Sequence, residues 1–198
     1  MRRLYNKFLK RWKDIILAVI AIILLAPLLM VIAISIKLDS KGPVLFKQQR
    51  VGADKALFTI FKFRTMHVDT PKDTPTHLLT LPDVHITKVG QFLRKTSLDE
   101  LPQLFNIFGG SMSIIGPRPA LYNQADLIEK RDEVGANDLK PGLSGLAQVM
   151  GRDTLTIEEK AKLDGLYSQS ISFSTDIKLI FNTVRKIIRR DGIQEGAS

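Results

Sequence analysis

The longest apolar run of the chain extends from Ile15 to Ile36 and contains no charged residue. At about 1.5 Å per helical residue, it is long enough to cross a hydrocarbon core about 30 Å thick. We therefore expect this segment to enter a membrane. A cleaved signal peptide is the alternative, but the run exceeds the usual apolar region of such a peptide, and no small-x-small cleavage site precedes Lys37.

Positive charge flanks the apolar run on both sides. The flanking cations are Arg2, Arg3, Lys7, Lys10, Arg11, Lys13, Lys37, Lys41, Lys47 and Arg50. The positive-inside rule therefore gives neither end a preference for the cytoplasm. Pro27 lies near the middle of the run and removes a backbone hydrogen bond, as a bend would require. Two topologies stay open: a re-entrant helix hairpin broken at Pro27, and a straight spanning helix that tolerates its proline.

A second helical pattern occupies residues 176–190, before Gly192 ends it. Its apolar positions are Ile177, Ile180, Phe181, Val184, Ile187 and Ile188, and basic residues take other positions. A basic amphipathic helix of this kind can lie in an anionic membrane interface. Packing of the apolar face on the protein core explains the same pattern, so both interpretations stay open.

Two runs, VLFKQQRV and ALFTIFKFRT, flank residues 52–55 and predict a β-hairpin. Lys62 and Arg64 are two residues apart, so we expect their side chains on one face of the second strand. Such a pair either holds phosphate oxygens or forms a solvated strand face. A loop rich in Pro, Thr and Asp follows at 67–85, and a short helix is expected over 89–95.

Ser97-Leu98-Asp99-Glu100 fits the capping box, which predicts that a helix begins at Ser97 and ends near Gly110. Pro102 is tolerated in a first turn. Acidic residues there also suit the positive end of the helix dipole. On this segment alone, capping is the simpler interpretation of the two carboxylates, and catalysis is the alternative.

Two further segments carry cations in constrained surroundings. Prolines on both sides of Arg118 limit its backbone, so its planar guanidinium can be held for a bidentate phosphate or carboxylate contact. The glycine-rich segment 140–152 ends on Arg152. It is not a Walker loop, and the sequence contains no G-x-G-x-x-G, so neither common nucleotide-binding loop is present.

The composition narrows the chemistry. A length of 198 residues suits a single domain with a core. The absence of cysteine excludes disulfides, thiolate nucleophiles and cysteine-ligated zinc. The three histidines lack the spacing of metal ligands, so a metal would be a hard cation on oxygen ligands. The net charge of +9 predicts an anionic partner: nucleic acid, acidic lipid or a phosphorylated substrate.

Three segments together resemble a known family: KFRTM at 62–66, LRKTSLDELPQLFNIFGGSMSIIGPRP at 93–119 and PGLSGLAQVMGR at 141–152. They are similar to the bacterial sugar transferases, monotopic polyprenyl-phosphate phosphoglycosyl transferases that begin glycan assembly on a lipid carrier. The resemblance covers nearly the whole chain and corresponds to the short catalytic-core form of the family, without the multi-span N-terminal extension of larger members.

The resemblance implies an α+β fold. The expected protein is mostly helical and monotopic, with an N-terminal re-entrant membrane helix hairpin broken at Pro27, a small β-hairpin and interfacial amphipathic helices. The expected division is a basic segment and re-entrant helix over 1–38, followed by a catalytic domain over 39–198. That domain is expected on the cytoplasmic face of the cell membrane.

The resemblance also implies a reaction. Such enzymes move a sugar 1-phosphate from a UDP-sugar to undecaprenyl phosphate and release UMP. Asp99 matches the family nucleophile, which forms a phosphosugar-aspartyl intermediate, and Glu100 matches the residue that positions Mg2+. The matching candidates for phosphate or substrate contacts are Lys62, Arg94, Arg118, Arg152 and Asp164. A carboxylate that attacks a phosphate needs cations and metal to neutralise the charge.

With this resemblance, capping and catalysis become compatible, because amides at a helix start would face an anionic substrate. The expected partners are a UDP-sugar, undecaprenyl phosphate and membrane lipid, without nucleic acid, and a homo-oligomer stays open. Residues 118–138 suggest an N-acetylated amino sugar, with galactose or glucose as the alternative. Rivals from other classes are an inactive membrane scaffold of polysaccharide assembly and a membrane-anchored nucleic-acid binder.

Overall fold

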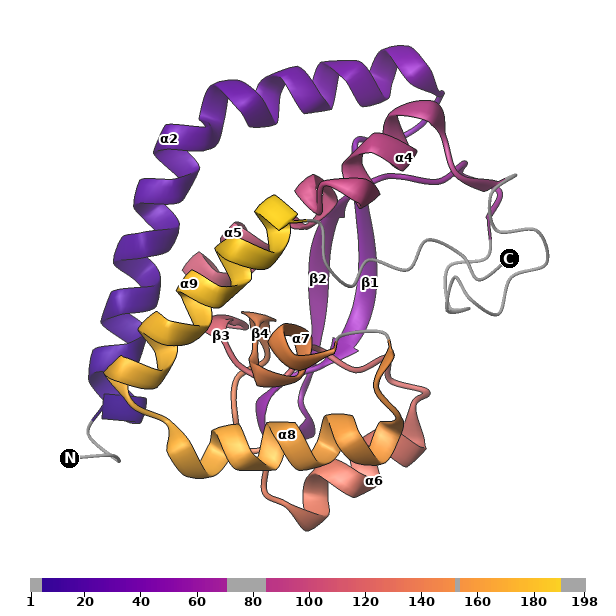
Figure 1. Cartoon of the computed structure of the whole chain (residues 1–198). Coiled ribbons are helices and arrows are strands. Elements are labelled where there is room, and N and C mark those ends of the chain that lie inside the picture. The colour runs from indigo at the N-terminus through magenta and orange to yellow at the C-terminus, as the bar shows by residue number, and fades with distance from the viewer. Residues whose placement is uncertain (1–4, 71–84, 152–153, 190–198) are drawn as a thin grey trace.

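The computed structural model describes residues 5–70, 85–151 and 154–189. Figure 1 shows a long helix, α2, that arches along one side of a smaller body of short helices and strands. In chain order the elements are η1 (Tyr5–Leu9), α2 (Lys10–Asp39), β1 (Leu45–Val51), η2 (Ala53–Lys55), β2 (Leu57–Phe63), α4 (Lys88–Lys95), η4 (Leu98–Glu100), α5 (Gln103–Gly109), β3 (Ser113–Ile115), α6 (Ala125–Glu133), β4 (Gly142–Ser144), α7 (Leu146–Met150), α8 (Ile157–Ser170) and α9 (Phe173–Arg189).

The apolar run forms one continuous helix, α2, so the predicted break at Pro27 is wrong. The helix instead bends strongly along its length (Figure 1). Pro27 lies inside it and accounts for a bend, because a proline removes one hydrogen bond while the turns on either side persist. Within the described residues, α2 is the one helix long and apolar enough to cross a membrane. Many of its large apolar side chains are exposed, Leu24 and Met30 among them.

Both ends of α2 are attached to the same body. Near its start, Arg11 donates hydrogen bonds to the carbonyls of Ile107 (2.5 Å) and Phe108 (2.8 Å). At its end, an Asp39 carboxylate oxygen accepts from the backbone nitrogen of Val89 at 3.0 Å. The long apolar helix therefore leaves the folded body and returns to it.

The predicted β-hairpin is confirmed, with β1 and β2 antiparallel and Leu45 opposite Phe63. Lys62 lies on β2, but Arg64 does not join it in a phosphate-facing pair. Arg64 is buried and donates to the carbonyls of Ser40 (2.8 Å) and Lys41 (2.5 Å), where it fixes the segment that follows α2. The predicted short helix is also confirmed, as α4.

A parallel pair of short strands, β3 and β4, was not predicted from the sequence. Ser113 pairs with Gly142, and Ile115 pairs with Ser144. The two backbones approach so closely that a Cβ at Gly142 would lie 2.1 Å from the nitrogen of Gly116. The pairing therefore requires glycine at position 142, and it places the segment 116–119 beside the glycine-rich loop.

The amphipathic helix predicted over 176–190 is observed as α9, Phe173–Arg189, and Gly192 lies outside the described residues. Packing on the protein core is confirmed for one face, and the membrane-interface interpretation stays a prediction for the other. Leu179 is 4% exposed and packs in the core, whereas Phe173 and Phe181 are 58% and 67% exposed. The helix therefore anchors to the body and also presents an uncovered apolar face, as α2 does.

Candidate active site

Asp99 and Glu100 lie on a short 3-10 turn, η4, rather than at the start of a regular helix. Ser97 has a φ of 55°, and its side chain makes no capping hydrogen bond. It follows the end of α4, where a left-handed residue commonly terminates a helix. The helix predicted from Ser97 begins instead at Gln103, so the capping box is wrong. The predicted helix end is confirmed, with Gly110 at a φ of 92°.

Glu100 lies between two cations. One of its carboxylate oxygens accepts a hydrogen bond from Lys62 Nζ at 2.8 Å and another from Arg118 Nη2 at 2.7 Å. The Glu100 side chain is 10% exposed, whereas those of Lys62 and Arg118 are 19% and 37% exposed, so the carboxylate is the most desolvated member of the two ion pairs. The pairs join three elements far apart in the sequence: the strand β2, the turn η4 and the segment after β3. The prediction that Lys62, Glu100 and Arg118 belong to one site agrees with this geometry.

Asp99 is held differently. Its carboxylate lies 3.9 Å from Lys62 Nζ, beyond hydrogen-bond distance, and its side chain is 13% exposed. Burial raises the pKa of Asp99; the charge of Lys62 lowers it, and the neighbouring carboxylate of Glu100 raises it again. The pKa of Asp99 therefore lies above its ordinary range. The structure thus keeps one carboxylate of the pair tightly bonded and leaves the other available.

Arg94 contributes from α4. Its Nε donates to the hydroxyl of Thr65 at 2.9 Å, just beyond the end of β2. Its charge also lowers the pKa of Asp99, although less than Lys62 does. The structure therefore brings Lys62, Arg94 and Arg118 into the electrostatic surroundings of one carboxylate, as the sequence predicted.

The backbone that carries Arg118 is fixed by two further arginines. Arg131 Nη1 donates to the Arg118 carbonyl at 2.9 Å, and Arg50 Nη1 donates to the Pro119 carbonyl at 3.1 Å. Two charged hydrogen bonds therefore support a segment whose prolines already limit its freedom. The result is a rigid base from which the Arg118 guanidinium reaches Glu100.

Asp164 belongs to the support of the Arg118 backbone and does not lie at the surface of the site. Its side chain is 1% exposed and accepts from Arg131 Nε at 2.9 Å and from Arg131 Nη2 at 2.6 Å. Burial raises the pKa of Asp164, and the charge of Arg131 lowers it. Because Asp164 holds Arg131 and Arg131 holds the Arg118 backbone, this geometry makes Asp164 a positioning residue.

Sequence reasoning missed Arg50 and Arg131. Arg50 and Gln48 are two residues apart on β1, and the Gln48 side-chain oxygen accepts from Arg50 at 2.7 Å. Burial lowers the pKa of Arg50 to about 10, and the charge of Arg118 adds to the effect. The strand LFKQQRV also carries Lys47 and Gln49, so no pattern along it distinguishes Arg50. Arg131 lies in the charged run EKRDE, and nothing in that run distinguishes it.

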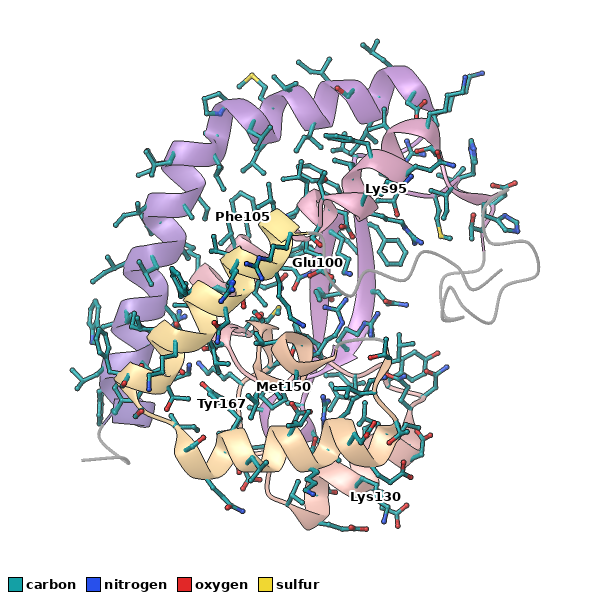
Figure 2. The ribbon with its side chains drawn as sticks, in the orientation of Figure 1. Lys95, Glu100, Phe105, Lys130, Met150 and Tyr167 are labelled. Atoms are coloured by element: carbon teal, nitrogen blue, oxygen red, sulfur yellow. The ribbon has the colours of Figure 1, made fainter. Side chains whose placement is uncertain are left out.

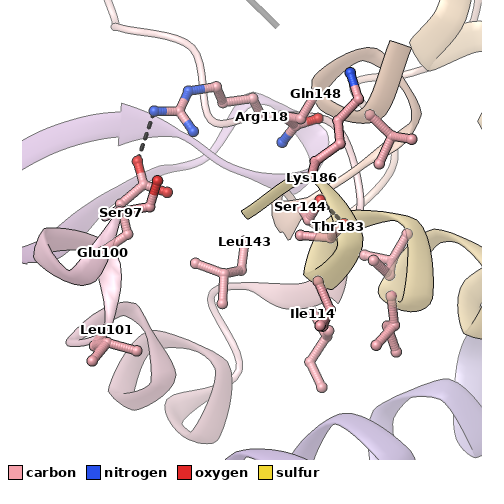
Figure 3. A pocket seen from close by; sticks show the side chains of 14 residues that line it. Ser97, Glu100, Leu101, Ile114, Arg118, Leu143, Ser144, Gln148, Thr183 and Lys186 are labelled. Atoms are coloured by element: carbon pink, nitrogen blue, oxygen red, sulfur yellow. Dashed lines mark hydrogen bonds and ion pairs between the residues drawn. The ribbon is translucent and has the colours of Figure 1, made fainter. Parts of the chain in front are cut away.

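A pocket of about 210 Å³ opens beside the pair (Figure 3). Glu100 and Arg118 lie at one part of its lining, and a dashed line joins them in the figure. The remaining walls come from the residues that flank η4 and from β3, β4, α7 and α9. Apolar side chains form most of them: Leu101, Ile114, Ile115, Leu143, Val149, Ile180 and Val184. Arg152, the last predicted contact residue, lies outside the described residues.

The carboxylate pair fits magnesium only in part. No group of three or more His, Cys, Asp or Glu that could hold a metal occurs within the described residues. Mg2+ usually keeps several waters and takes one or two protein carboxylates together with substrate phosphates. Asp99 and Glu100 supply hard oxygen donors of that kind. The donor set therefore suits a magnesium ion that arrives with a phosphorylated substrate.

These features place two carboxylates among three cations, on a protein with an exposed, membrane-length apolar helix. Residues 5–190 match the family model described as bacterial sugar transferase. The chain therefore belongs to the bacterial sugar transferase family, and the resemblance noted in the sequence is confirmed.

Three relatives illustrate the family. The chain is 42% identical over 188 residues to a UDP-glucose:undecaprenyl-phosphate glucose-1-phosphate transferase of Klebsiella pneumoniae, covering 91% of this chain and 40% of that protein. It is 36% identical over 203 residues to an undecaprenyl-phosphate galactose phosphotransferase of Salmonella typhimurium, covering 94% and 42%. It is 38% identical over 188 residues to the uncharacterized sugar transferase EpsL of Bacillus subtilis, covering 94% and 91%. The chain thus spans about two fifths of the first two relatives and nearly all of the third.

Proposed function

We propose that this chain is a phosphoglycosyl transferase that moves a sugar 1-phosphate from a UDP-sugar to undecaprenyl phosphate and releases UMP. Family membership and the names of the relatives support the class of reaction. The observation that carries the proposal is the asymmetric carboxylate pair. Glu100 is bonded to Lys62 and Arg118, whereas Asp99 is largely buried, has a raised pKa and forms no hydrogen bond to Lys62.

In the proposed first step, an ionised Asp99 oxygen attacks the β-phosphorus of the UDP-sugar. The new oxygen–phosphorus bond forms as the bond between that phosphorus and the α–β bridging oxygen breaks, and UMP leaves with the bridging oxygen. The product is a sugar phosphate joined to Asp99. A covalent intermediate of this kind divides one difficult transfer into two easier ones.

In the proposed second step, a phosphate oxygen of the lipid acceptor attacks the same phosphorus. The Asp99–phosphorus bond breaks, the free carboxylate returns, and the lipid carries the sugar through a diphosphate. Both steps bring two anions together, so nearby positive charge lowers the barrier. Lys62, Arg94 and Arg118 are our assignments for that role, because all three already act on the pKa of Asp99.

We propose magnesium as the cofactor. Glu100 would hold it together with the substrate phosphates, and a bound magnesium ion would neutralise developing phosphate charge. Glu100 would then exchange its present ion pairs with Lys62 and Arg118 for the metal. The cations Lys62 and Arg118 that it now binds would be released toward the phosphates.

The donor is proposed to be a UDP-hexose or a UDP-linked N-acetylated amino sugar. The relatives are named for glucose and galactose, which favours the hexoses for the first assays. The amino sugar suggested by residues 118–138 stays a prediction to be tested in the same series.

The test is UMP release from a panel of UDP-sugars with undecaprenyl phosphate and Mg2+, run beside Asp99→Asn. We expect turnover with at least one donor and near-complete loss in the variant. Absence of UMP release with every donor, from a folded protein, would instead favour an inactive scaffold of polysaccharide assembly.

We also propose that α2 re-enters the membrane and that the body lies on the cytoplasmic face. The bend and the return of both helix ends to one body support this topology, since a straight spanning helix would separate its ends by the thickness of the bilayer. The topology would let a soluble donor and a lipid phosphate meet on one side.

The lack of cysteine makes this topology testable by single-cysteine labelling. Trp12 and Leu38, which are 64% and 84% exposed, mark the two ends of α2. We expect Trp12→Cys and Leu38→Cys to be protected from an impermeant maleimide in intact spheroplasts and modified in inverted vesicles. Labelling of the two positions from opposite sides would establish a spanning helix.

A further inference from the structure

The pocket of Figure 3 contains a polar group that its structure does not satisfy. The side-chain nitrogen and oxygen of Gln148 are both shielded from solvent, and neither has a hydrogen-bond partner within the described part of the chain. In Figure 3 no dashed line reaches Gln148, whereas Arg118 is joined to Glu100. A buried amide without hydrogen-bond partners destabilises the folded protein. A ligand that forms hydrogen bonds with this amide would satisfy it.

The Gln148 amide lies against the backbone of Gly145. Gln148 belongs to α7, a short helix, and its carbonyl oxygen lies close to Gly145, where a Cβ would be only 2.7 Å away. Because Gly145 carries no side chain, the amide is accommodated there, in the wall of the pocket that Gln148 lines.

The walls of the pocket limit what that ligand is. Its volume of about 210 Å³ is below the roughly 300–1,000 Å³ typical of pockets for whole drug-sized ligands, so it suits one part of a substrate. Most of the lining is apolar, and the hydroxyls of Ser144 and Thr183 already bond each other at 2.7 Å. A hexose ring would leave several hydroxyls without partners here, which is costly.

A prenyl chain would match the apolar walls but would leave the Gln148 amide unpaired. A pyrimidine base satisfies both constraints, because it has two apolar faces and a polar edge. Uracil offers a ring N–H donor beside a carbonyl acceptor, and a primary amide pairs with that edge through two parallel hydrogen bonds. Arg118 and Glu100 line the same pocket, where they would face the phosphates attached to the base.

We propose that Gln148 reads the imide edge of the donor's uracil base, which occupies the pocket between α7 and α9. This assignment builds on the proposed function and names the group that selects a uridine nucleotide. It makes Gln148 a specificity-determining residue, separate from the cations that bind phosphate.

The test compares UMP with N3-methyl-UMP, whose methyl group removes the ring N–H donor, in binding to the full chain in detergent. We expect the wild-type protein to bind UMP about 10- to 100-fold more tightly than the methylated nucleotide. Gln148→Leu should weaken UMP binding by a similar factor and bind both nucleotides alike. Gln169→Leu, the same change at an exposed glutamine of α8, should retain the wild-type preference.

The outcomes separate this inference from the proposed function. Equal binding of the two nucleotides by the wild-type protein, or a full preference for UMP in Gln148→Leu, overturns the role of Gln148. If Gln148→Leu does not fold, the wild-type comparison decides alone. Displacement of UMP by undecaprenol, the lipid without its phosphate headgroup, would assign the pocket to the prenyl chain. That result would also overturn the inference. Failure of UMP release with every UDP-sugar, beside an intact preference for UMP, would contradict the proposed reaction and leave the base pocket in place.

Discussion

Two aspartates show how the same side chain serves structure in one region and chemistry in another. Asp176 at the start of α9 is completely buried, and Asp99 on η4 is nearly so. Figure 2 shows the labelled Glu100, next to Asp99 in sequence, and Tyr167, a partner of Asp176, in separate parts of the molecule. The two carboxylates differ in how completely their surroundings compensate for burial.

Asp176 is fully compensated. One oxygen accepts from Lys10 (2.8 Å), Lys13 (2.5 Å) and the Tyr5 hydroxyl (2.8 Å), and the other accepts from the Tyr167 hydroxyl (2.6 Å). Burial alone would raise the pKa of Asp176, but these lysines and hydrogen bonds outweigh it and lower the pKa. The cluster joins the first turns of α2 to α8 and α9.

Asp99 is only partly compensated, and its pKa is raised. An under-satisfied, largely buried carboxylate costs stability, and groups with perturbed pKa values concentrate at functional sites. The comparison therefore predicts that changes at Asp176 act on folding and that changes at Asp99 act on activity.

The largest expected effect is on turnover. Asp99→Asn removes the proposed nucleophile, so we expect UMP release to fall by at least about 1,000-fold. The variant should retain its fold by circular dichroism. A variant that kept more than a tenth of the wild-type rate would contradict the assignment of Asp99.

The converse change should act on stability. Asp176→Asn leaves Lys10 and Lys13 buried without their shared counter-charge, and breaking a buried ion pair in this way costs about 3–5 kcal/mol. Chemical denaturation in detergent measures the loss. As a control, Lys55→Met breaks a solvent-exposed ion pair with Asp132 and should leave the free energy of unfolding unchanged in the same measurement. Equal losses of stability in the two variants would show that the buried ion pairs stabilise the fold no more than the exposed pair does.

Lys62→Met should produce an intermediate effect with a distinct pH signature. Loss of this cation should lower kcat about 10- to 100-fold, because it removes charge that stabilises the phosphoryl transfer. Lys62 also lowers the pKa of Asp99, so its removal should move the acid limb of the pH–rate profile to higher pH. The matched control is Lys47→Met, at an exposed lysine on the neighbouring strand β1. An unchanged acid limb in Lys62→Met would mean that Asp99 does not set it.

The smallest expected effect is a gain in stability. Because the folded-state pKa of Asp99 is raised, its ionisation costs folding free energy above that pKa. Asp99→Asn should therefore have a higher Tm than the wild-type protein at neutral pH. The gap should shrink as the pH falls through the folded-state pKa toward the ordinary value of 3.8. A Tm below that of the wild-type protein at neutral pH would show that Asp99 is a structural residue like Asp176.

The sequence predicted local structure well where the signal was long. The apolar helix, the β-hairpin and the amphipathic C-terminal helix all exist. Their signals were an unbroken apolar run, two strand-like runs around a turn, and a helical period over many residues. The capping-box pattern shows where prediction from a local pattern fails. Thr156 and Glu159 form a complete capping box at α8, whereas Ser97 and Glu100 share that spacing and form none. Glu100 is bound to Lys62 and Arg118 instead, and distant partners of this kind are absent from a local pattern.

The chemistry of the site could be predicted only in part. Asp99, Glu100, Lys62, Arg94 and Arg118 stand in segments whose resemblance to a family is strong. The support for Arg118 could not be predicted, because Arg50, Arg131 and Asp164 meet it through contacts between β1, α6, α8 and the segment after β3. Such contacts depend on tertiary packing, which a single sequence does not specify.

The most direct test of the central claim is to trap the protein in mid-reaction. The chain is mixed with a UDP-sugar labelled in the sugar, without lipid acceptor, quenched in acid and analysed by mass spectrometry of its peptides. We expect one sugar phosphate per chain on the peptide that contains Asp99, none in Asp99→Asn, and release of the label when undecaprenyl phosphate is added. A label on another side chain, or turnover without any covalent label, would contradict the central claim.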